Sequence, residues 1–350
     1  MKKYIPSLNG LRALSILMVL LGHIDQKNFD DMLQHQYPLL IDAQLGVNVF
    51  FVISGFLITN LLLVEEKHTG SISFKGFYLK RIFRIFPVYY VLLTVYLVLQ
   101  LLHVLEFSGL SWLTSLTYTK YLNWHADWET GHLWSLSIEE QFYLLWPFVF
   151  KFAKSYRKHF AFAIIAIVPL LRAFYVVHPI QWMDYLTIFQ RVDAIMWGCV
   201  FAIYHESILA SCRRITNKYA WLALAPFIAI PLLSAITLIN HHYNLHMGLF
   251  IAPFGGTTGT VADIAIGLMI IISIHYSNNL WFTFLNTPVM NYIGKLSYSL
   301  YIWQQLFFSS RLGALSKWPL NLVLIFITAN ISLYFIEKPF LSLKSKFGLE

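Results

Sequence analysis

The stretch Leu45-Gly-Val-Asn-Val-Phe-Phe-Val-Ile-Ser-Gly-Phe-Leu-Ile-Thr-Asn-Leu-Leu-Leu-Val64 decides the class of fold. It contains no Asp, Glu, Lys or Arg, and a helix of about 20 apolar residues is long enough to cross the hydrocarbon core of a bilayer. Comparable apolar segments begin near Leu11, Ile82, Leu133, Phe160, Ile188, Tyr219, Val261, Ile293 and Pro319. The sequence therefore predicts an all-α integral membrane protein, a bundle of about ten transmembrane helices.

The composition agrees with that class. Of 350 residues, 58% are hydrophobic and 12% are charged, whereas a soluble domain has about a quarter of its residues charged. This balance excludes a disordered chain, a nucleic-acid-binding module and a disulfide-rich secreted scaffold. The two cysteines, Cys199 and Cys212, form no CxxC pair and no metal-ligand pattern, so we expect neither redox chemistry nor a bound metal.

Charged residues between the apolar segments predict the orientation of the chain. Basic residues precede the first and third segments and follow the fourth and sixth: Lys2, Lys3 and Arg12; Lys67, Lys75, Lys80, Arg81 and Arg84; Lys151, Lys154, Arg157 and Lys158; Arg213, Arg214 and Lys218. The alternate loops are poor in basic residues and carry Asp25, Asp30, Asp31, Asp42, Asp127 and Glu129. Because cytoplasmic loops are enriched in Lys and Arg, both termini are predicted to be cytoplasmic.

The chain reads as one domain, residues 1–350, because no repeat, low-complexity tract or Pro- and Gly-rich linker divides it. The first apolar segment is not a cleavable signal peptide, since Arg12, Ser15 and His23 interrupt it. Ionisable residues inside membrane helices are rare and are functional candidates by default. The candidates are Arg12, His23, Arg81, Arg84, Glu139, Glu140, Arg191 and Asp193.

Arg12 and His23 are eleven residues apart, which places them on one helix face, about 16 Å apart along the axis. A cation at the cytoplasmic end and an imidazole near mid-membrane suit a long anionic ligand whose reactive end lies deep. Alternatively, Arg12 reaches lipid head groups and His23 bonds a neighbouring helix.

Arg81 and Arg84, at positions i and i+3, can converge on one phosphate. The alternative is that basic residues at a cytoplasmic helix end are expected from topology alone.

Glu139 and Glu140 are adjacent, so one is expected to point into the bundle and the other towards its rim or another partner. A buried Glu beside a His can fix the tautomer of the imidazole, and the alternative is a structural pair with Arg191.

The side chains of Arg191 and Asp193 differ in direction by about 200° around the helix axis, so they cannot share a helix face. Asp193 can complement the helix dipole if it lies in the first turn. His241, His242 and His246 match no strong metal signature and are expected to be solvated loop residues.

Four motifs together resemble the acyltransferase-3 family of polytopic membrane acyltransferases, and the similarity covers almost the whole chain. They are Leu8-Asn-Gly-Leu-Arg-Ala13 with Gly22-His23, Gly46-Val-Asn-Val-Phe-Phe-Val-Ile-Ser-Gly-Phe-Leu57, Phe77-Tyr-Leu-Lys-Arg-Ile-Phe-Arg-Ile-Phe-Pro87, and the stretch from His132 to Pro147. Each motif alone is weak, but their order and spacing together are specific.

The resemblance implies transfer of an acyl group from cytoplasmic acyl-CoA, most often acetyl-CoA, to a hydroxyl on a sugar of a cell-envelope or exported polysaccharide or glycolipid. It implies that His23 is catalytic and that Arg12 is its partner. It also implies that Arg81 and Arg84 contact CoA, and that the position of Glu139 varies less among family members than that of Glu140. Further candidates for contact with the substrate or the transition state are Ser54, Glu140, Arg191 and Asp193. The implied location is the inner (cytoplasmic) membrane, with multiple crossings and with membrane lipid as surroundings.

Two features depart from the family pattern. Many members have His where this chain has Gln304, so a mechanism that needs a second histidine there is in doubt. The chain also stops soon after Glu337-Lys-Pro-Phe340, so we expect no fused extracytoplasmic hydrolase-like domain. Transfer is then completed in the membrane domain or passed to a separate extracytoplasmic transferase partner.

Our hypothesis is that neutral His23, oriented by Glu139, removes the proton of the acceptor hydroxyl. Arg191 is a candidate for stabilising the oxyanion, although nothing in the sequence places it there. An acyl-histidine relay is the variant. The alternatives are a proton-coupled secondary transporter, a non-catalytic membrane scaffold, and acylation of a small cytoplasmic acceptor. No repeated halves or paired interrupted helices favour the transporter.

Overall fold

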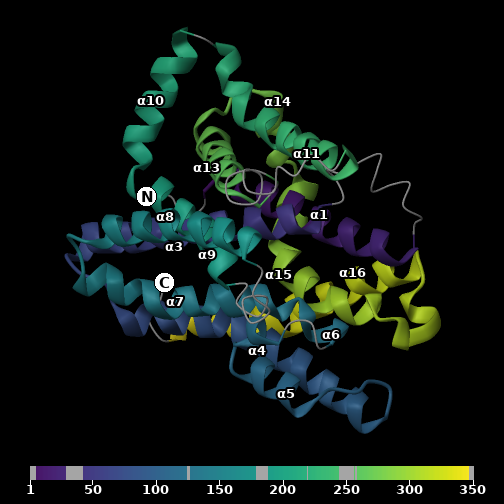
Figure 1. Ribbon diagram of the computed structural model, residues 1–350. Helices are drawn as coiled ribbons and strands as arrows, with labels where there is room; N and C mark the ends of the chain where they lie inside the picture. The colour runs from purple at the N-terminus through teal and green to yellow at the C-terminus, as the bar shows by residue number, and fades with distance from the viewer. Residues whose placement is uncertain are drawn as a thin grey trace.

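The computed structural model describes residues 5–28, 42–123, 127–178, 188–218, 220–243, 256 and 258–346, and over these residues the protein is helical without a strand (Figure 1). The longer helices are α1 (Leu8–Asn28), α3 (Ala43–Thr69), α4 (Phe74–Leu101), α7 (Leu133–Phe152), α8 (Arg157–Val177), α9 (Ile188–Ile203), α10 (His205–Lys218), α11 (Ala225–Tyr243), α13 (Thr260–His275), α15 (Pro288–Phe308) and α16 (Leu320–Ser332). The shorter elements are α5 (Gly109–Leu116), η1 (Lys120–Leu122), α6 (Trp128–Gly131), η3 (Ala220–Leu224), α14 (Leu280–Leu285), η4 (Ser310–Ser316), the π-helical η5 (Leu333–Glu337) and α17 (Lys338–Lys346).

Several helices are long and apolar enough to cross a bilayer. In the described part of the chain they are α3, α4, α8 and the continuous run Leu320–Leu343. A fifth candidate is the pair Arg191–Ile203 and His205–Ile215, which is bent by 80°. Each of the ten apolar segments predicted from the sequence overlaps a helix. The protein is therefore an all-α membrane protein, while the number of crossings and the side of the termini stay predictions.

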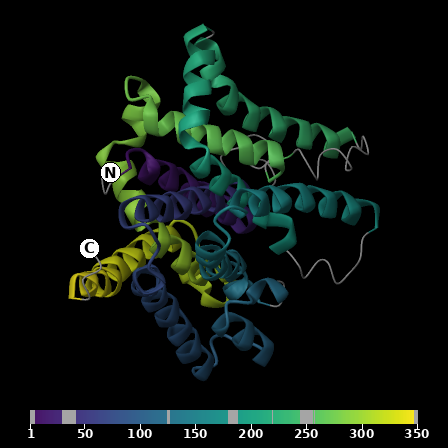
Figure 2. The ribbon, with the colours of Figure 1, turned by 90° about the vertical axis from the view of Figure 1, so that its left-hand side faces the viewer.

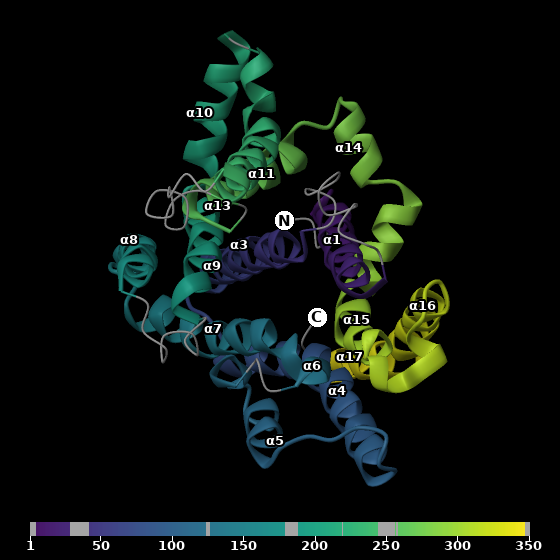
Figure 3. The ribbon, with the colours of Figure 1, turned by 45° about the vertical axis from the view of Figure 1, so that its right-hand side comes forward.

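Helix α3 forms the middle of the bundle. It packs against α1, α7, α9 and α13, and Figure 3 shows these helices around it. Helix α15 packs along α1, and α16 packs on the other side of α15. The green helices α10 and α11 extend away from the purple α1 and the blue α3, as Figures 1 and 2 show. The residues that the sequence singles out lie on α1, α3, α4, α7 and α9, which meet in this bundle.

Glycines let two helix pairs approach closely. A Cβ atom on Gly55 of α3 would lie 1.9 Å from the Ile195 carbonyl oxygen of α9, and one on Gly198 of α9 would lie 2.2 Å from the Val52 carbonyl oxygen. A Cβ on Gly294 of α15 would likewise lie 2.0 Å from the carbonyl oxygen of Asn9 at the start of α1. Small residues at helix contacts allow such backbone approach in membrane bundles.

Candidate active site

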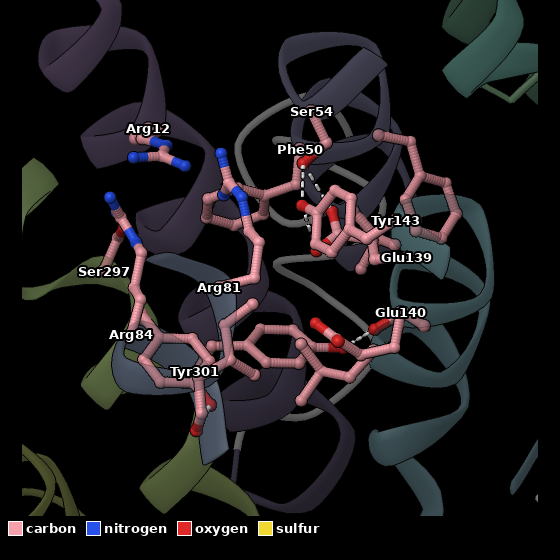
Figure 4. A pocket seen from close by; sticks show the side chains of 16 residues that line it. Arg12, Phe50, Ser54, Arg81, Arg84, Glu139, Glu140, Tyr143, Ser297 and Tyr301 are labelled. Atoms are coloured by element: carbon pink, nitrogen blue, oxygen red, sulfur yellow. Dashed lines mark hydrogen bonds between the residues drawn. The ribbon is translucent and has the colours of Figure 1, made fainter. Parts of the chain in front are cut away.

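A polar pocket lies among α1, α3, α4, α7 and α15 (Figure 4). Its volume is about 70 Å³, which is room for a few water molecules or one compact polar group. It is lined by Arg12, Val47, Phe50, Phe51, Ser54, Arg81, Arg84, Ile85, Ser135, Leu136, Glu139, Glu140, Tyr143, Ser297, Tyr298 and Tyr301. Six of the nine residues that the sequence singles out, Arg12, Ser54, Arg81, Arg84, Glu139 and Glu140, therefore meet in one place, although they come from four helices.

Three arginines share this pocket. Arg12 enters from α1, and Arg81 and Arg84 enter from α4 at the i, i+3 spacing that the sequence predicts. Figure 4 shows the three guanidinium groups on the same side of the pocket. The Arg81 guanidinium lies 5.1 Å from the centre of the Tyr143 ring, an arrangement in which the ring face attracts the cation. The Nε of Arg12 is buried and has no hydrogen-bond partner among the described residues.

Glu139 faces the arginines from the other side of the pocket. Its carboxylate accepts hydrogen bonds from the Ser54 hydroxyl at 2.8 Å and from the Tyr143 hydroxyl at 3.3 Å. The same Tyr143 hydroxyl lies 3.0 Å from the Ser54 oxygen, which closes a three-membered network. Glu140 also lines the pocket, so both adjacent glutamates border it. The printed contacts with Ser54 and Tyr143 belong to Glu139, and the expectation that Glu140 faces the rim or another partner stays a prediction.

The charges around the pocket favour an anionic ligand. Three guanidinium groups and two carboxylates leave one positive charge in excess when all five groups are ionised. Like charges gathered in a site of low dielectric repel one another more strongly than they do in water. A phosphate or another anion would relieve this repulsion, and arginine binds such groups bidentately. The three arginines of this pocket are therefore suited to an anionic group such as a phosphate.

His23 lies at the other end of α1 and is not among the described residues that line the pocket. Its ring stacks on Phe308 at 6.1 Å and meets Trp128 edge to face at 5.9 Å. Its Nδ1 lies 2.8 Å from the Val19 carbonyl oxygen. Because a carbonyl oxygen can only accept, Nδ1 carries the proton in the neutral ring and Nε2 carries the lone pair. In this tautomer Nε2 is the acceptor nitrogen of His23.

The geometry corrects the role predicted for Glu139. The hydrogen-bond partners of Glu139 are Ser54 and Tyr143, and the group that orients His23 is the carbonyl of Val19. The reason is the length of α1, because Glu139 lies level with Arg12, about 16 Å along the helix from His23. Arg12 and His23 do lie on the same side of α1, as predicted, since each meets α15, the first beside Ser297 and the second against Phe308.

Arg191 and Asp193 are not among the described residues that line the pocket, and their predicted contact with the substrate or the transition state stays a prediction. Arg191 donates to the side-chain oxygen of Gln44 at 3.0 Å. Asp193 is buried and pairs with Arg172 of α8, and Arg172 also donates to the Thr258 carbonyl at 2.9 Å. The different partners agree with the predicted difference in helix face. Asp193 is the sixth residue of α9, beyond the first turn, and its role is to join α8 to α9.

Several polar residues of the bundle were not predicted from the sequence. Arg172 and Asp263 are buried inside apolar segments, and the test for ionisable residues should have found both. Tyr143, which stands one turn after Glu139, gave no signal beyond its motif. His132 is buried, and its Nε2 lies 3.2 Å from the Ile302 carbonyl oxygen, yet the sequence marked it only as the start of a motif. Tyrosine and a single histidine are common in membrane helices, so composition does not distinguish them.

Another buried charged group lies outside the apolar helices, near the His23 end. Lys120 of η1 donates to the Ser111 hydroxyl at 2.9 Å, and its Nζ lies 3.7 Å from the Asp127 carboxylate. Burial lowers the pKa of Lys120 to about 8, although Asp127 opposes this shift. The ammonium of Lys120 therefore loses its proton in the folded protein far more readily than in water.

No group of three or more His, Cys, Asp or Glu side chains suited to a metal ion occurs among the described residues. His246 lies outside those residues, and so do the side chains of His241 and His242. The described part of the chain contains one close histidine pair, His205 and His275, whose Nε2 atoms lie 2.7 Å apart.

Comparisons with known proteins agree with this site. Residues 5–336 match the model of the acyltransferase-3 family, which is described as an acyltransferase domain. The O-acetyltransferase OatA of Staphylococcus aureus (strain NCTC 8325 / PS 47) is 28% identical over 366 residues, which cover 96% of this chain and 57% of OatA. A protein of Staphylococcus aureus (strain COL), provisionally named an O-acetyltransferase, is 28% identical over 367 residues, 97% of this chain and 57% of its own length. The chain thus spans little more than half the length of these relatives, and no solved structure matches it.

Proposed function

Because the chain belongs to the acyltransferase-3 family, we propose that it is an O-acyltransferase that moves an acyl group from cytoplasmic acyl-CoA to the hydroxyl of a sugar. One observation carries the proposal: a single helix, α1, holds an arginine-lined pocket at one end and an imidazole with a basic Nε2 about 16 Å further along. An acyl-CoA is a long molecule with phosphates at one end and a thioester at the other. Its phosphates therefore suit the arginine pocket, and its thioester suits the position near His23.

The arginine pocket is the proposed anchor of the donor. Arg81 and Arg84, with Arg12, bind a phosphate of CoA, and Glu139 limits the repulsion among them before the ligand arrives. Anchoring the charged end confines the thioester near His23, which raises the rate through proximity. The names of the relatives support acetyl as the acyl group and acetyl-CoA as the cosubstrate.

His23 is the proposed general base. Its Nε2 takes the proton of the acceptor hydroxyl while the hydroxyl oxygen forms a bond to the thioester carbonyl carbon. The carbon–sulfur bond then breaks, and the sulfur leaves with the proton that His23 returns, so the products are an ester and free CoA. In the relay variant, Nε2 itself attacks the thioester carbonyl carbon, the carbon–sulfur bond breaks, and CoA leaves as its thiol with the Nδ1 proton. The acceptor hydroxyl then attacks the acyl-imidazole, the carbon–nitrogen bond breaks, and the hydroxyl proton returns to the imidazole.

The proposed acceptor is a sugar of an envelope or exported polysaccharide or of a glycolipid, and the proposed location is the inner (cytoplasmic) membrane, which the protein crosses several times. The apolar helices α3, α4 and α8 support a membrane location. A separate extracytoplasmic transferase is the proposed partner if the acyl group has to travel beyond the membrane domain. The network of Glu139, Ser54 and Tyr143 serves to hold the pocket in shape.

The deciding experiment compares the protein with His23→Ala in membranes supplied with acetyl-CoA that carries a labelled acetyl group. We expect transfer to purified envelope polysaccharide to fall by roughly 100-fold or more, because general-base catalysis contributes that much. His159→Ala, which removes an exposed histidine from α8, is the matched control and should transfer at the normal rate. Equal label with the protein and with His23→Ala would refute the proposal, and proton-coupled uptake without CoA would favour a transporter.

A second experiment tests the arginine pocket as the binding site of the CoA phosphates. Arg81→Ala should raise the KM for acetyl-CoA by about 10- to 100-fold, which is the effect of losing one hydrogen bond to a charged group. Lys75→Ala is the control, since Lys75 is an exposed basic residue near the start of the same helix. An unchanged KM in Arg81→Ala would exclude this pocket as the phosphate site even if His23 proves essential.

A further inference from the structure

Four buried polar side chains near His23 lack partners for at least one of their polar atoms within the described part of the chain. They are Thr130, His132, Gln304 and Gln305, each at most 5% exposed. An unpaired buried polar atom costs about 1–3 kcal/mol, so native proteins keep few of them without a reason. Gln304 is the extreme case, because it is 0% exposed and neither its Oε1 nor its Nε2 has a partner.

The register of α15 places Gln304 beside α1. Residues 294, 297, 301, 304 and 308 follow one another at three- and four-residue steps, so they form one stripe on the helix. Gly294 meets the carbonyl of Asn9, Ser297 shares a pocket with Arg12, and Phe308 stacks on His23. Gln304 therefore lies on the side of α15 that faces α1, about 6 Å along the axis from Phe308.

His132 brings the other unpaired groups to the same end of the bundle. Its Nε2 contacts the carbonyl of Ile302, two residues before Gln304, and its ring is close enough to that of His23 for the two to interact electrostatically. Because Nε2 faces a carbonyl oxygen, it carries the proton in the neutral ring, and Nδ1 has no hydrogen-bond partner within the described residues. Helix α6, which carries Thr130, contacts α15.

The unpaired atoms are mostly acceptors. The Oε1 atoms of Gln304 and Gln305 need donors, whereas the Nε2 of Gln304 needs an acceptor. A thioester group offers no donor, so this group by itself cannot satisfy the Oε1 atoms. A sugar offers several hydroxyl groups, each of which donates and accepts.

We propose that Gln304 is an acceptor-binding residue, whose amide holds a hydroxyl-rich sugar beside His23 at a site that also includes His132, Gln305 and Thr130. This inference rests on the proposed function, because it takes the substrate that receives the acyl group to be a sugar. Gln304 donates through Nε2 to one hydroxyl oxygen and accepts through Oε1 from another. It fixes the reacting hydroxyl and leaves the removal of the proton to His23.

The test uses Gln304→Met, which keeps the length of the side chain and removes both hydrogen-bonding atoms. The matched control is Asn321→Leu, because Asn321 is also 0% exposed but has both partners: its Nδ2 donates to Ser316 and its Oδ1 accepts from the Leu322 amide. For each purified full-length variant we would measure the Tm, the KM for acetyl-CoA, and the KM for polysaccharide prepared from the envelope of the expressing cells.

We expect Gln304→Met to raise the KM for the polysaccharide by about 10-fold and to leave the KM for acetyl-CoA unchanged. Its Tm should equal or exceed that of the parent protein, since an unpaired buried amide has been removed. Asn321→Leu should lower the Tm and change neither KM. An unchanged KM for the polysaccharide in Gln304→Met, or equal changes in both KM values together with a lower Tm, would overturn the inference and make Gln304 a structural residue.

A binding measurement separates this inference from the proposed function. At one polysaccharide concentration, the Tm should rise equally in the parent protein and in His23→Ala, and clearly less in Gln304→Met, because binding that is about 10-fold weaker stabilises less. If His23→Ala still transfers acetyl groups, the proposed function fails. If His23→Ala is inactive while the polysaccharide stabilises Gln304→Met as strongly as it stabilises the parent, only the role of Gln304 fails.

Discussion

Asp193 illustrates at the scale of one residue why an ionisable group in an apolar helix need not be catalytic. Its carboxylate is buried against the guanidinium of Arg172, and the pair joins α8 to α9. Buried ion pairs of this kind add little net stability, but removing one partner leaves a charge without compensation in a medium of low dielectric. The sequence revealed the charge of Asp193, but it gave no information on which helix supplies the partner.

We therefore predict that Asp193→Ala lowers the stability of the fold by about 3 to 5 kcal/mol and leaves the activity per folded molecule unchanged. The double substitution Arg172→Met with Asp193→Leu should recover most of the loss, because it removes both charges. Glu206→Ala is the control, since that carboxylate is 91% exposed. Detergent unfolding curves would report the stability, and a variant that folds normally but is inactive would return Asp193 to the active site.

Lys120 gives a prediction about pH. Burial lowers its pKa to about 8 from an ordinary value of 10.5, so between these values the folded protein binds fewer protons than the unfolded chain. Stability then rises as the pH increases across this window, and the burial cost is fully present below pH 8. We expect the Tm of the parent protein to rise relative to that of Lys120→Met between pH 8 and pH 10. Parallel Tm profiles would mean that Lys120 stays charged throughout.

At the scale of helices, the sequence predicted where helices occur along the chain better than it predicted which helices contact one another. All ten apolar segments coincide with helices, because a long run of apolar residues leaves the backbone no alternative in lipid. The neighbours of each helix were not predictable, since α1 and α15 pack together although 259 residues lie between Asn28, the end of α1, and Pro288, the start of α15. For the same reason the sequence suggested that Glu139 meets His23, whereas the packing of α7 brings Glu139 to Arg12.

The contact between α3 and α9 depends on glycine. In Gly198→Ala the added methyl group would meet the Val52 carbonyl oxygen at 2.2 Å, so one backbone has to move away from the other. We predict a marked loss of folded protein in detergent, because backbone atoms cannot give way as a flexible side chain can. Gly109→Ala is the control, since nothing lies within 4 Å of its added methyl group. Normal yield and Tm for Gly198→Ala would show that the helices separate without cost.

At the scale of the whole molecule, composition sufficed to predict a membrane protein. The order of the motifs sufficed to identify the family, which the match over residues 5–336 confirms. The crossing pattern and the sides of the termini depend on loop charges, and they stay predictions. The relatives are longer than this chain, so the activity of the whole protein also has to be measured rather than carried over.

The predicted orientation can be tested with a membrane-impermeant maleimide, after Cys199 and Cys212 have been replaced. We expect Thr117→Cys, between α5 and η1, to react in intact cells, because it lies in a loop predicted to face outward. Ser155→Cys, between α7 and α8, should react only after the membrane is opened, because basic residues surround it. Both positions are exposed, so a failure to react would reflect the side of the membrane. The reverse result would invert the topology.

Helix α1 carries both Arg12 and His23, and the consequence concerns the size of the acyl chain. A helix rises by a fixed 1.5 Å per residue, so changes in packing cannot lengthen or shorten the span between the two side chains. On the proposed function, a longer acyl chain must therefore fit beyond His23, where Trp128 and Phe308 enclose the imidazole. These two aromatic rings, rather than the arginine pocket, would then set the longest acyl chain that the enzyme accepts.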